Sequence, residues 1–161
     1  MKFNRKPNRL KNYDYSSQGA YFITICTLDR KCILSTIVGD DAHIVPLCDA
    51  LIAPQTNLTH CGEIARKYIE SMPGIDKYVI MPNHIHLLIA IDGPMKASAP
   101  TISVPNLIRS FKVLVSKEIG QSIWQRSYHD HIIRDEEDYL NHLQYIENNP
   151  ARWSEDKYYT M

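Results

Sequence analysis

Residues 75–91 read IDKYVIMPNHIHLLIAI, and this stretch says most about the fold. Residues with strand propensity lie on both sides of Pro82-Asn83, a typical turn pair, so the stretch predicts strands over Ile75–Met81 and His84–Ile91 joined tightly. In the second strand, side chains two residues apart point to the same face. We therefore expect His84 and His86 to stand side by side, with Ile85 turned into the core behind them.

The elements around this hairpin follow a regular order. They comprise a strand over 20–28, a helix from the N-cap Thr59 to about Ser71, a helix over 104–119 between Ser103 and Gly120, a strand within 124–133, and a helix from the N-cap Asp135 to about Asn149. Between the first strand and the first helix, Gly39-Asp40-Asp41 indicates a turn between two short strands. The order β-α-β-β-α-β predicts an α+β, ferredoxin-like fold: an antiparallel sheet with two helices on one face and an additional C-terminal helix.

Length and composition fit one globular domain, and the overall charge gives no argument for a nucleic-acid partner. The chain has 161 residues, of which 44% are hydrophobic and 22% charged, and its net charge is zero. We expect a basic N-terminal arm over 1–18 and a single domain over 19–161. Arg5, Lys6 and Arg9 of the arm could follow a phosphate backbone, or could be a solvated terminus.

The cysteines and the absence of long apolar runs indicate a cytoplasmic protein. The four cysteines show no CxxC spacing, so we expect reduced thiols. The basic arm is not followed by an apolar run, as a signal peptide would be, and we expect no membrane span.

Two histidines on one strand face can form half of a divalent-metal site. The alternative is a pair of surface or hydrogen-bonded histidines, because two ligands alone do not define a site. His129 and His131 form a second His-x-His pair. This pair could complete a zinc site with the first one, or have a structural role.

The last helix carries two tyrosines that helix geometry separates. At about 100° per residue, one stripe is apolar and a second, about 120° away, is polar. The apolar stripe holds Tyr139, Leu140, Leu143 and Ile146, and the polar one holds Asp138, His142, Tyr145 and Asn149. Tyr139 is then a core residue, whereas Tyr145 could be a nucleophile activated by a metal or a base. The alternatives are a boundary tyrosine for Tyr145 and a helix C-cap for Asn149.

A few further residues could contact nucleic acid. Arg109 and Lys112 lie on the polar side of the 104–119 helix and could bind phosphates, as could Arg126, although such residues commonly form a solvated face. Trp124 is most simply a core residue, with base stacking as the alternative.

Several of these motifs resemble one known family. His84-Ile85-His86 is similar to the HUH motif, in which U is a bulky apolar residue. The opening stretch 5–10, the strand residues 21–24, and the segments 124–134, 139–140 and 145–150 are similar to sequences of single-tyrosine HUH transposases. The similarity is to the branch that contains the REP-associated tyrosine transposases and their insertion-sequence relatives. The resemblance covers nearly the whole chain.

The resemblance implies a transposase that nicks and rejoins single-stranded hairpin DNA. It implies that His84, His86 and Asn149 bind Mg²⁺ or Mn²⁺, and that Tyr145 forms a 5′-phosphotyrosine and releases a 3′-hydroxyl. Asn149 stands where relatives can carry Gln. Members of this group can be homodimers, with the tyrosine helix acting in cis or in trans. Two alternatives remain open: a domesticated, non-catalytic hairpin-DNA-binding protein, and a small zinc-dependent hydrolase using His84, His86, His129 and His131.

Overall fold

The computed structural model describes residues 12–38, 55–92 and 102–160. In chain order its elements are β1 (Gly19–Cys26), η1 (Leu28–Arg30), β2 (Ser35–Val38), β3 (Gln55–Leu58), α1 (His60–Glu70), β4 (Ile75–Ile80), β5 (His84–Ile91), α2 (Val104–Ile119), β6 (His129–Ile132), α3 (Glu136–Asn148) and η2 (Pro150–Glu155). The two η elements are short 3₁₀ helices.

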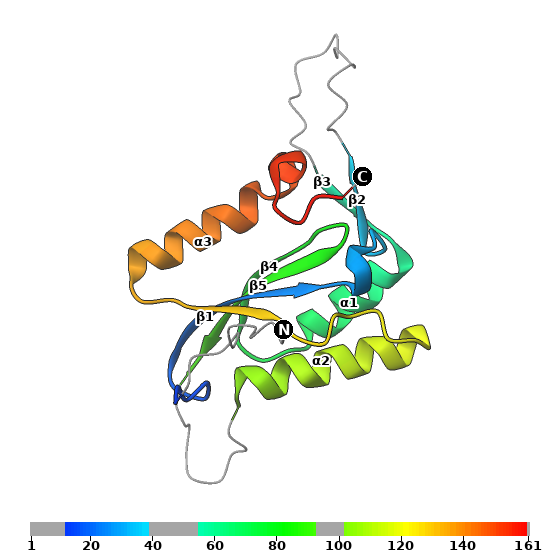
Figure 1. The fold of residues 1–161 in the computed structure, drawn as a ribbon. Coiled ribbons are helices and arrows are strands. Elements are labelled where there is room, and N and C mark those ends of the chain that lie inside the picture. The colour runs from blue at the N-terminus through cyan, green and yellow to red at the C-terminus, as the bar shows by residue number, and fades with distance from the viewer. Residues whose placement is uncertain (1–11, 39–54, 93–101, 161) are drawn as a thin grey trace, which may run out of the picture.

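The main sheet has four antiparallel strands in the order β4-β5-β1-β6. Helices α1 and α2 lie together on one side of this sheet, and α3 lies across the other side (Figure 1). The short strands β2 and β3 pair only with each other. This arrangement confirms the α+β, ferredoxin-like fold, because β1 and β4 run parallel with β5 between them and antiparallel to both.

The predicted hairpin forms with its turn at Pro82-Asn83. Ile80 pairs with Ile85, Val79 pairs with His86, and the Met81 amide donates to the His84 carbonyl at 2.9 Å. Because the turn fixes the register, the alternation of side chains along β5 is fixed as well.

The sheet separates two apolar layers. Tyr21, Ile23 and Ile25 of β1, with Ile85 and other residues of β5, pack in the larger core under α1 and α2. The opposite face carries a smaller core under α3 and η2, made of Val79, Met81, Leu88, Ile146 and Trp153. His84 and His86 lie on this second face, which confirms that Ile85 points away from them into the main core.

The helix ends agree with the capping residues in the sequence. Thr59 and Asp135 accept hydrogen bonds from the Gly62 and Asp138 amides, and Gly120 ends α2 with a φ of 85°. Ser103 occupies the N-cap position of α2 but makes no side-chain cap hydrogen bond.

Two details differ from the expectations, and a third lies beyond what the structure describes. The first strand ends at Cys26 rather than 28, because the chain turns into η1 and the Leu28 amide donates to the Ile123 carbonyl. Leu140, assigned to the apolar stripe of the last helix, is 53% exposed, so the inner face of α3 is narrower than expected. The turn 39–41 lies outside the described residues, and β2 pairs with 55–58.

The packed domain reaches into the segment assigned to the basic arm. Tyr15 is buried in the main core, and the edge of the Tyr13 ring packs 5.1 Å from it, between ring centroids. Arg5, Lys6 and Arg9 lie outside the described residues. Cys26, Cys32 and Cys61 are free thiols, and Cys48 is outside the described part. None of the helices in the described segments has the length and apolar character needed to cross a bilayer.

Candidate active site

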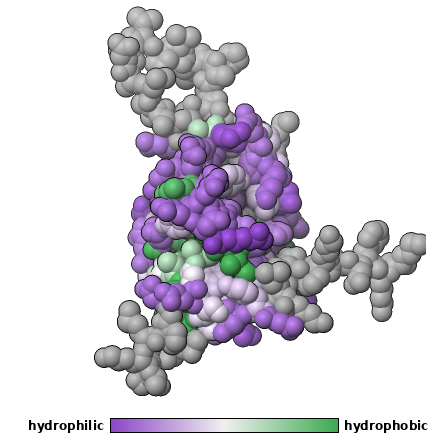
Figure 2. Space-filling view, turned by 90° about the vertical axis from the view of Figure 1, so that its left-hand side faces the viewer, coloured by the Kyte–Doolittle hydropathy of each residue, from purple (hydrophilic) through white to green (hydrophobic). Residues whose placement is uncertain are grey.

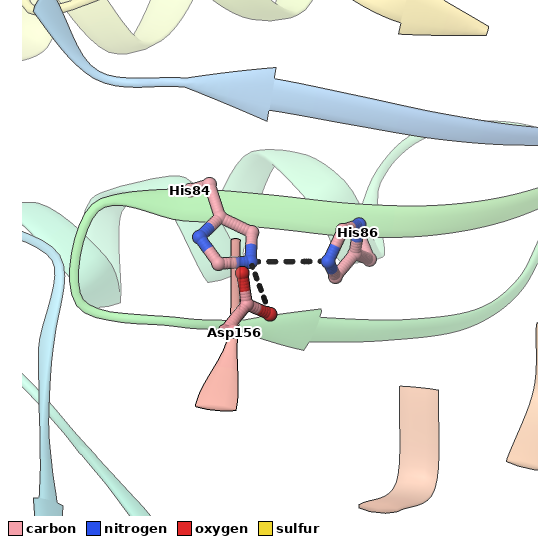
Figure 3. Close-up of side chains that lie close together, drawn as sticks. All are labelled: His84, His86 and Asp156. Atoms are coloured by element: carbon pink, nitrogen blue, oxygen red, sulfur yellow. Dashed lines mark hydrogen bonds and ion pairs between the residues drawn. The ribbon is translucent and has the colours of Figure 1, made fainter. Parts of the chain in front are cut away.

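The two histidines of β5 are buried and aim one nitrogen each at the same point. Their side chains are 0% and 1% exposed, and the Nε2 atoms of His84 and His86 are 3.0 Å apart (Figure 3). His84 Nδ1 lies 2.9 Å from Asn83 Oδ1, and His86 Nδ1 lies 2.9 Å from the Thr24 hydroxyl. An amide oxygen can only accept, so His84 donates from Nδ1 and its Nε2 carries a lone pair.

Burial keeps both imidazoles neutral at physiological pH. It lowers the pKa of His84 to about 4, although the nearby Asp156 carboxylate acts in the opposite direction. Burial also lowers the pKa of His86 well below the usual value, and His84 adds to this effect. Neutral imidazoles are the form that binds metal ions, so both histidines are ready to act as ligands.

The segment after α3 brings a carboxylate to this pair, which the sequence did not predict. The Asp156 side chain is 1% exposed, and its Oδ2 lies 3.9 Å from His84 Nε2 (Figure 3). Asn149 Nδ2 donates to the same oxygen at 3.0 Å, and the Tyr158 amide donates to Oδ1 at 2.7 Å. No periodicity marks Asp156 in the sequence, since only the path of η2 over the sheet places it here.

Tyr145 stands beside the histidines, on the neighbouring helix. Its ring lies 5.2 Å from the His86 ring and 5.9 Å from the Phe22 ring, between centroids. Its hydroxyl donates to Asp156 Oδ2 at 3.4 Å, and the side chain is 40% exposed. Burial, followed by the Asp156 charge, raises the pKa of Tyr145, so the resting hydroxyl is protonated. Tyr139, by contrast, packs against the smaller core and donates to Asp76.

A cavity of about 760 Å³ opens beside Tyr145. Phe22, His86 and Tyr145 form its aromatic part, and Arg152 and Lys157 add positive charge to its wall. Asn149 and Asp156 also line it. A flexible, charged polymer could therefore reach Tyr145 and His86 through one opening.

The donor atoms around the histidines fit a divalent cation. One ligand atom each from His84, His86 and Asp156 lies within 4.8 Å of the others. Asn149 is 3% exposed, and its buried Oδ1 has no hydrogen-bond partner within the described residues. Asn149 also contacts Asp156 through its Nδ2. Two imidazoles, a carboxylate and this orphaned amide oxygen offer a mixed nitrogen and oxygen donor set that suits Mn²⁺ and can accept Mg²⁺.

The other predicted DNA contacts are not part of this cavity. Arg109 and Lys112 belong to α2, on the opposite side of the sheet from α3 (Figure 1). The Lys112 ammonium donates to the carbonyls of Gln125 and Ser127, each at 2.8 Å, and so holds the segment before β6. Arg126 is exposed in that segment. DNA contact by these residues and by Arg5, Lys6 and Arg9 stays a prediction.

The four histidines considered for a zinc site do not come together. Thr24 of β1 pairs with His86 on one side and His129 on the other, so these histidines are two strand spacings apart, about 9–10 Å. His131 instead contacts Asp138 of α3. Trp124 is buried against Phe111 in the main core, as expected.

One relative among the known proteins shows the family of this chain, although no family model matches the sequence. The chain is 33% identical over 183 residues to an uncharacterised protein of Haemophilus influenzae, covering 96% of this chain and 93% of that protein. It is 37% identical over 156 residues to a Haemophilus influenzae protein with the provisional name of REP-associated tyrosine transposase, covering 89% of this chain and 77% of that protein. A solved structure of a REP-associated tyrosine transposase bound to a REP hairpin has the same fold, with a TM-score of 0.55 and 20% identity over 89% of this chain and 73% of that one.

Proposed function

Because the chain belongs to the family of REP-associated tyrosine transposases, we propose that it cuts and rejoins single-stranded hairpin DNA through a covalent bond to Tyr145. The observation that carries this proposal is the position of Tyr145, whose ring lies 5.2 Å from that of the buried His86 at the wall of one cavity. A hairpin substrate is supported by the structural relative, which is bound to a REP hairpin.

The nucleophilic step uses the tyrosine hydroxyl. The Tyr145 oxygen attacks the scissile phosphorus, the bond from phosphorus to the 3′-oxygen breaks, and that oxygen takes a proton to become a free 3′-hydroxyl. The proton of the tyrosine hydroxyl is lost as the new bond forms. Attack of a 3′-hydroxyl on the phosphotyrosine reverses these changes, so strands are rejoined without an external energy source.

The surrounding side chains hold the tyrosine for this attack. Asp156 accepts a hydrogen bond from its hydroxyl, and the rings of Phe22 and His86 contact its ring. Since the resting hydroxyl is protonated, the substrate complex must favour its deprotonation. Arg152 and Lys157 of the cavity wall offer positive charge to the DNA backbone.

A divalent cation, Mg²⁺ or Mn²⁺, would be held by His84, His86 and Asn149, with the Asp156 carboxylate next to them. When bound, such a cation polarises the scissile phosphate and offsets charge that develops in the displacement. The protein contributes the neutral nitrogens and the buried amide oxygen that the cation needs.

The test is a search for the covalent adduct. The protein is incubated with Mn²⁺ and end-labelled single-stranded hairpin oligonucleotides whose flanking nucleotides are randomised. We expect a protein–DNA species that survives denaturing electrophoresis, and we expect mass spectrometry to place the DNA on Tyr145.

Tyr145→Phe should abolish the adduct, and Tyr159→Phe is its matched control. Tyr159 is 39% exposed, nearly the same as Tyr145, and its ring packs on Trp153 at 5.2 Å rather than on the histidines. An adduct formed by Tyr145→Phe would refute the assignment of Tyr145 as the nucleophile. Hairpin binding without any adduct in the wild type would favour the non-catalytic DNA-binding protein.

A further inference from the structure

A second cluster of metal-binding side chains lies next to the proposed active site. It consists of His131 from β6 and of Asp138 and His142 from α3, and one donor atom of each lies within 4.8 Å of the other two. We infer that this cluster is a separate binding site for a transition-metal ion of the zinc type.

The fold brings the three residues together from two elements. Asp138 and His142 are four residues apart in α3, so they share one face of the helix. His131 pairs with Phe22 across β1 and β6, on the sheet face that α3 covers. A helical pair one turn apart, facing a ligand on a neighbouring strand, is a rigid arrangement for three donors.

The carboxylate of Asp138 contacts one nitrogen of each imidazole. Its Oδ2 is 2.8 Å from His131 Nε2, and its Oδ1 is 3.1 Å from His142 Nδ1. The two rings are stacked, with centroids 4.6 Å apart and an interplanar angle of 22°. A carboxylate is ionised at neutral pH, so Asp138 adds a negative charge that attracts a cation.

Two hydrogen bonds must be exchanged when an ion binds. His131 Nε2 donates to the Asp138 carboxylate at 2.8 Å, and His142 Nδ1 donates to the backbone carbonyl of Asp138 at 2.8 Å. Each ring must present a lone pair at this nitrogen to bind an ion, so the proton moves to its other ring nitrogen. The coordinate bonds replace the two hydrogen bonds.

The surroundings suit a hydrated ion that keeps some of its water. The side chains of His131, Asp138 and His142 are 41%, 21% and 22% exposed. The turn between β6 and α3 lies at the left of Figure 1, on the side that faces the viewer in Figure 2, where hydrophilic residues predominate. Two imidazoles and one carboxylate form a donor set favoured by Zn²⁺, Co²⁺, Ni²⁺ and Cu²⁺ over Mg²⁺, with water completing the coordination.

The cluster shares no donor residue with the site of His84 and His86, although His142 also lines the cavity beside Tyr145. The Phe22 ring packs against both histidine groups, with its centroid 5.0 Å from that of His86 and 4.6 Å from that of His142. Phe22 therefore stands between the two groups of donor residues. An ion at the second site would tie the edge strand β6 to α3, the helix that carries Tyr145.

Titration with Co²⁺, followed by visible absorption and equilibrium dialysis, tests this site without DNA. We expect His131→Ala and His142→Ala each to bind one Co²⁺ fewer than the wild type. His129→Ala is the matched control, because His129 is exposed on the same face of β6 but is not among the three donors. It should bind as many ions as the wild type.

The number of Co²⁺ ions bound per chain separates this proposal from the active-site proposal. If the His84 and His86 site binds no Co²⁺, the wild type binds one ion and the two variants bind none, and the second site still stands. Equal stoichiometry in the wild type, His131→Ala and His142→Ala would overturn the inference. Circular dichroism of each variant confirms that it is folded, and Asp138→Asn, which keeps the side-chain volume, replaces any variant that is not.

Discussion

His84 and His86 are two uncharged imidazoles in contact inside the protein, and neutral partners orient them. The Thr24 hydroxyl hydrogen-bonds to Nδ1 of His86, and the Asn83 side-chain oxygen accepts from Nδ1 of His84. Asn83 is fixed in turn because its Nδ2 donates to the Tyr158 carbonyl at 2.7 Å. Tyr158 also packs on the His84 ring at 4.7 Å between centroids. These contacts orient the Nε2 atoms toward a ligand but give little to stabilise a proton.

This burial predicts a loss of stability in acid. An unfolded His84 would titrate near 6.5, whereas in the folded protein its pKa is about 4. Between these values the unfolded chain binds more protons, so the stability is fully present above pH 6.5 and falls as the pH drops toward 4. In urea unfolding without metal, the free energy of unfolding of the wild type should fall more from pH 7.5 to pH 5 than that of His84→Gln.

The exposed His60 provides the control for this comparison. His60→Gln should lose as much stability between the two pH values as the wild type does. Equal losses in the wild type and His84→Gln would show that the His84 imidazole is not buried as described.

At the scale of elements, local sequence signals were sufficient for the hairpin and for the helix ends. Pro82-Asn83, Thr59 and Asp135 each act through their immediate neighbours, so a reader of the sequence can recognise them. The two-residue alternation of side chains along β5 likewise predicted that His84 and His86 share one face. The helical repeat of α3 separated Tyr145 from Tyr139.

The contacts that depend on distant segments could not be predicted in this way. Asp156 reaches the histidines only because η2 folds back over the sheet, and Leu140 is exposed because α3 contacts the sheet along a narrow face. The separation of His129 from His86 depends on β1 lying between their strands, which is a matter of strand order.

The cap of α3 gives a prediction at this scale. Asp135 accepts a hydrogen bond from the Asp138 amide at 2.8 Å, and its loss in Asp135→Ala should cost about 1 kcal/mol of stability. Ser103 has the equivalent position in α2 without a side-chain cap bond, so Ser103→Ala should change stability by no more than about 0.5 kcal/mol. Urea unfolding of the two variants measures the difference, and equal costs would contradict the capping role of Asp135.

At the scale of the whole molecule, the structure places the tyrosine helix and the histidine strand of one chain in contact. Resemblance to the family left open whether Tyr145 acts in cis or in trans. Here Ile146, next to Tyr145, is buried in the smaller core with Leu88 of β5, and Trp153 of η2 belongs to the same core. A helix held by this core presents its tyrosine to the histidines of its own chain.

Mixing two inactive variants tests this cis arrangement. Tyr145→Phe retains the histidines, and His86→Ala retains the tyrosine, so a dimer that shares residues across its interface would regain one intact site when the two are combined. In the cis arrangement each chain lacks an essential group, and the mixture should form less than about a hundredth of the wild-type covalent adduct, a deficit of about 2.7 kcal/mol in activation free energy.

The two variants must be unfolded and refolded together, so that chains exchange, and a mixture of wild type with either variant serves as the positive control. Recovery of adduct to about a quarter of the wild-type level, as random pairing of chains would give, would mean that the tyrosine helix is exchanged between subunits and that the packing of α3 on its own sheet does not persist in solution.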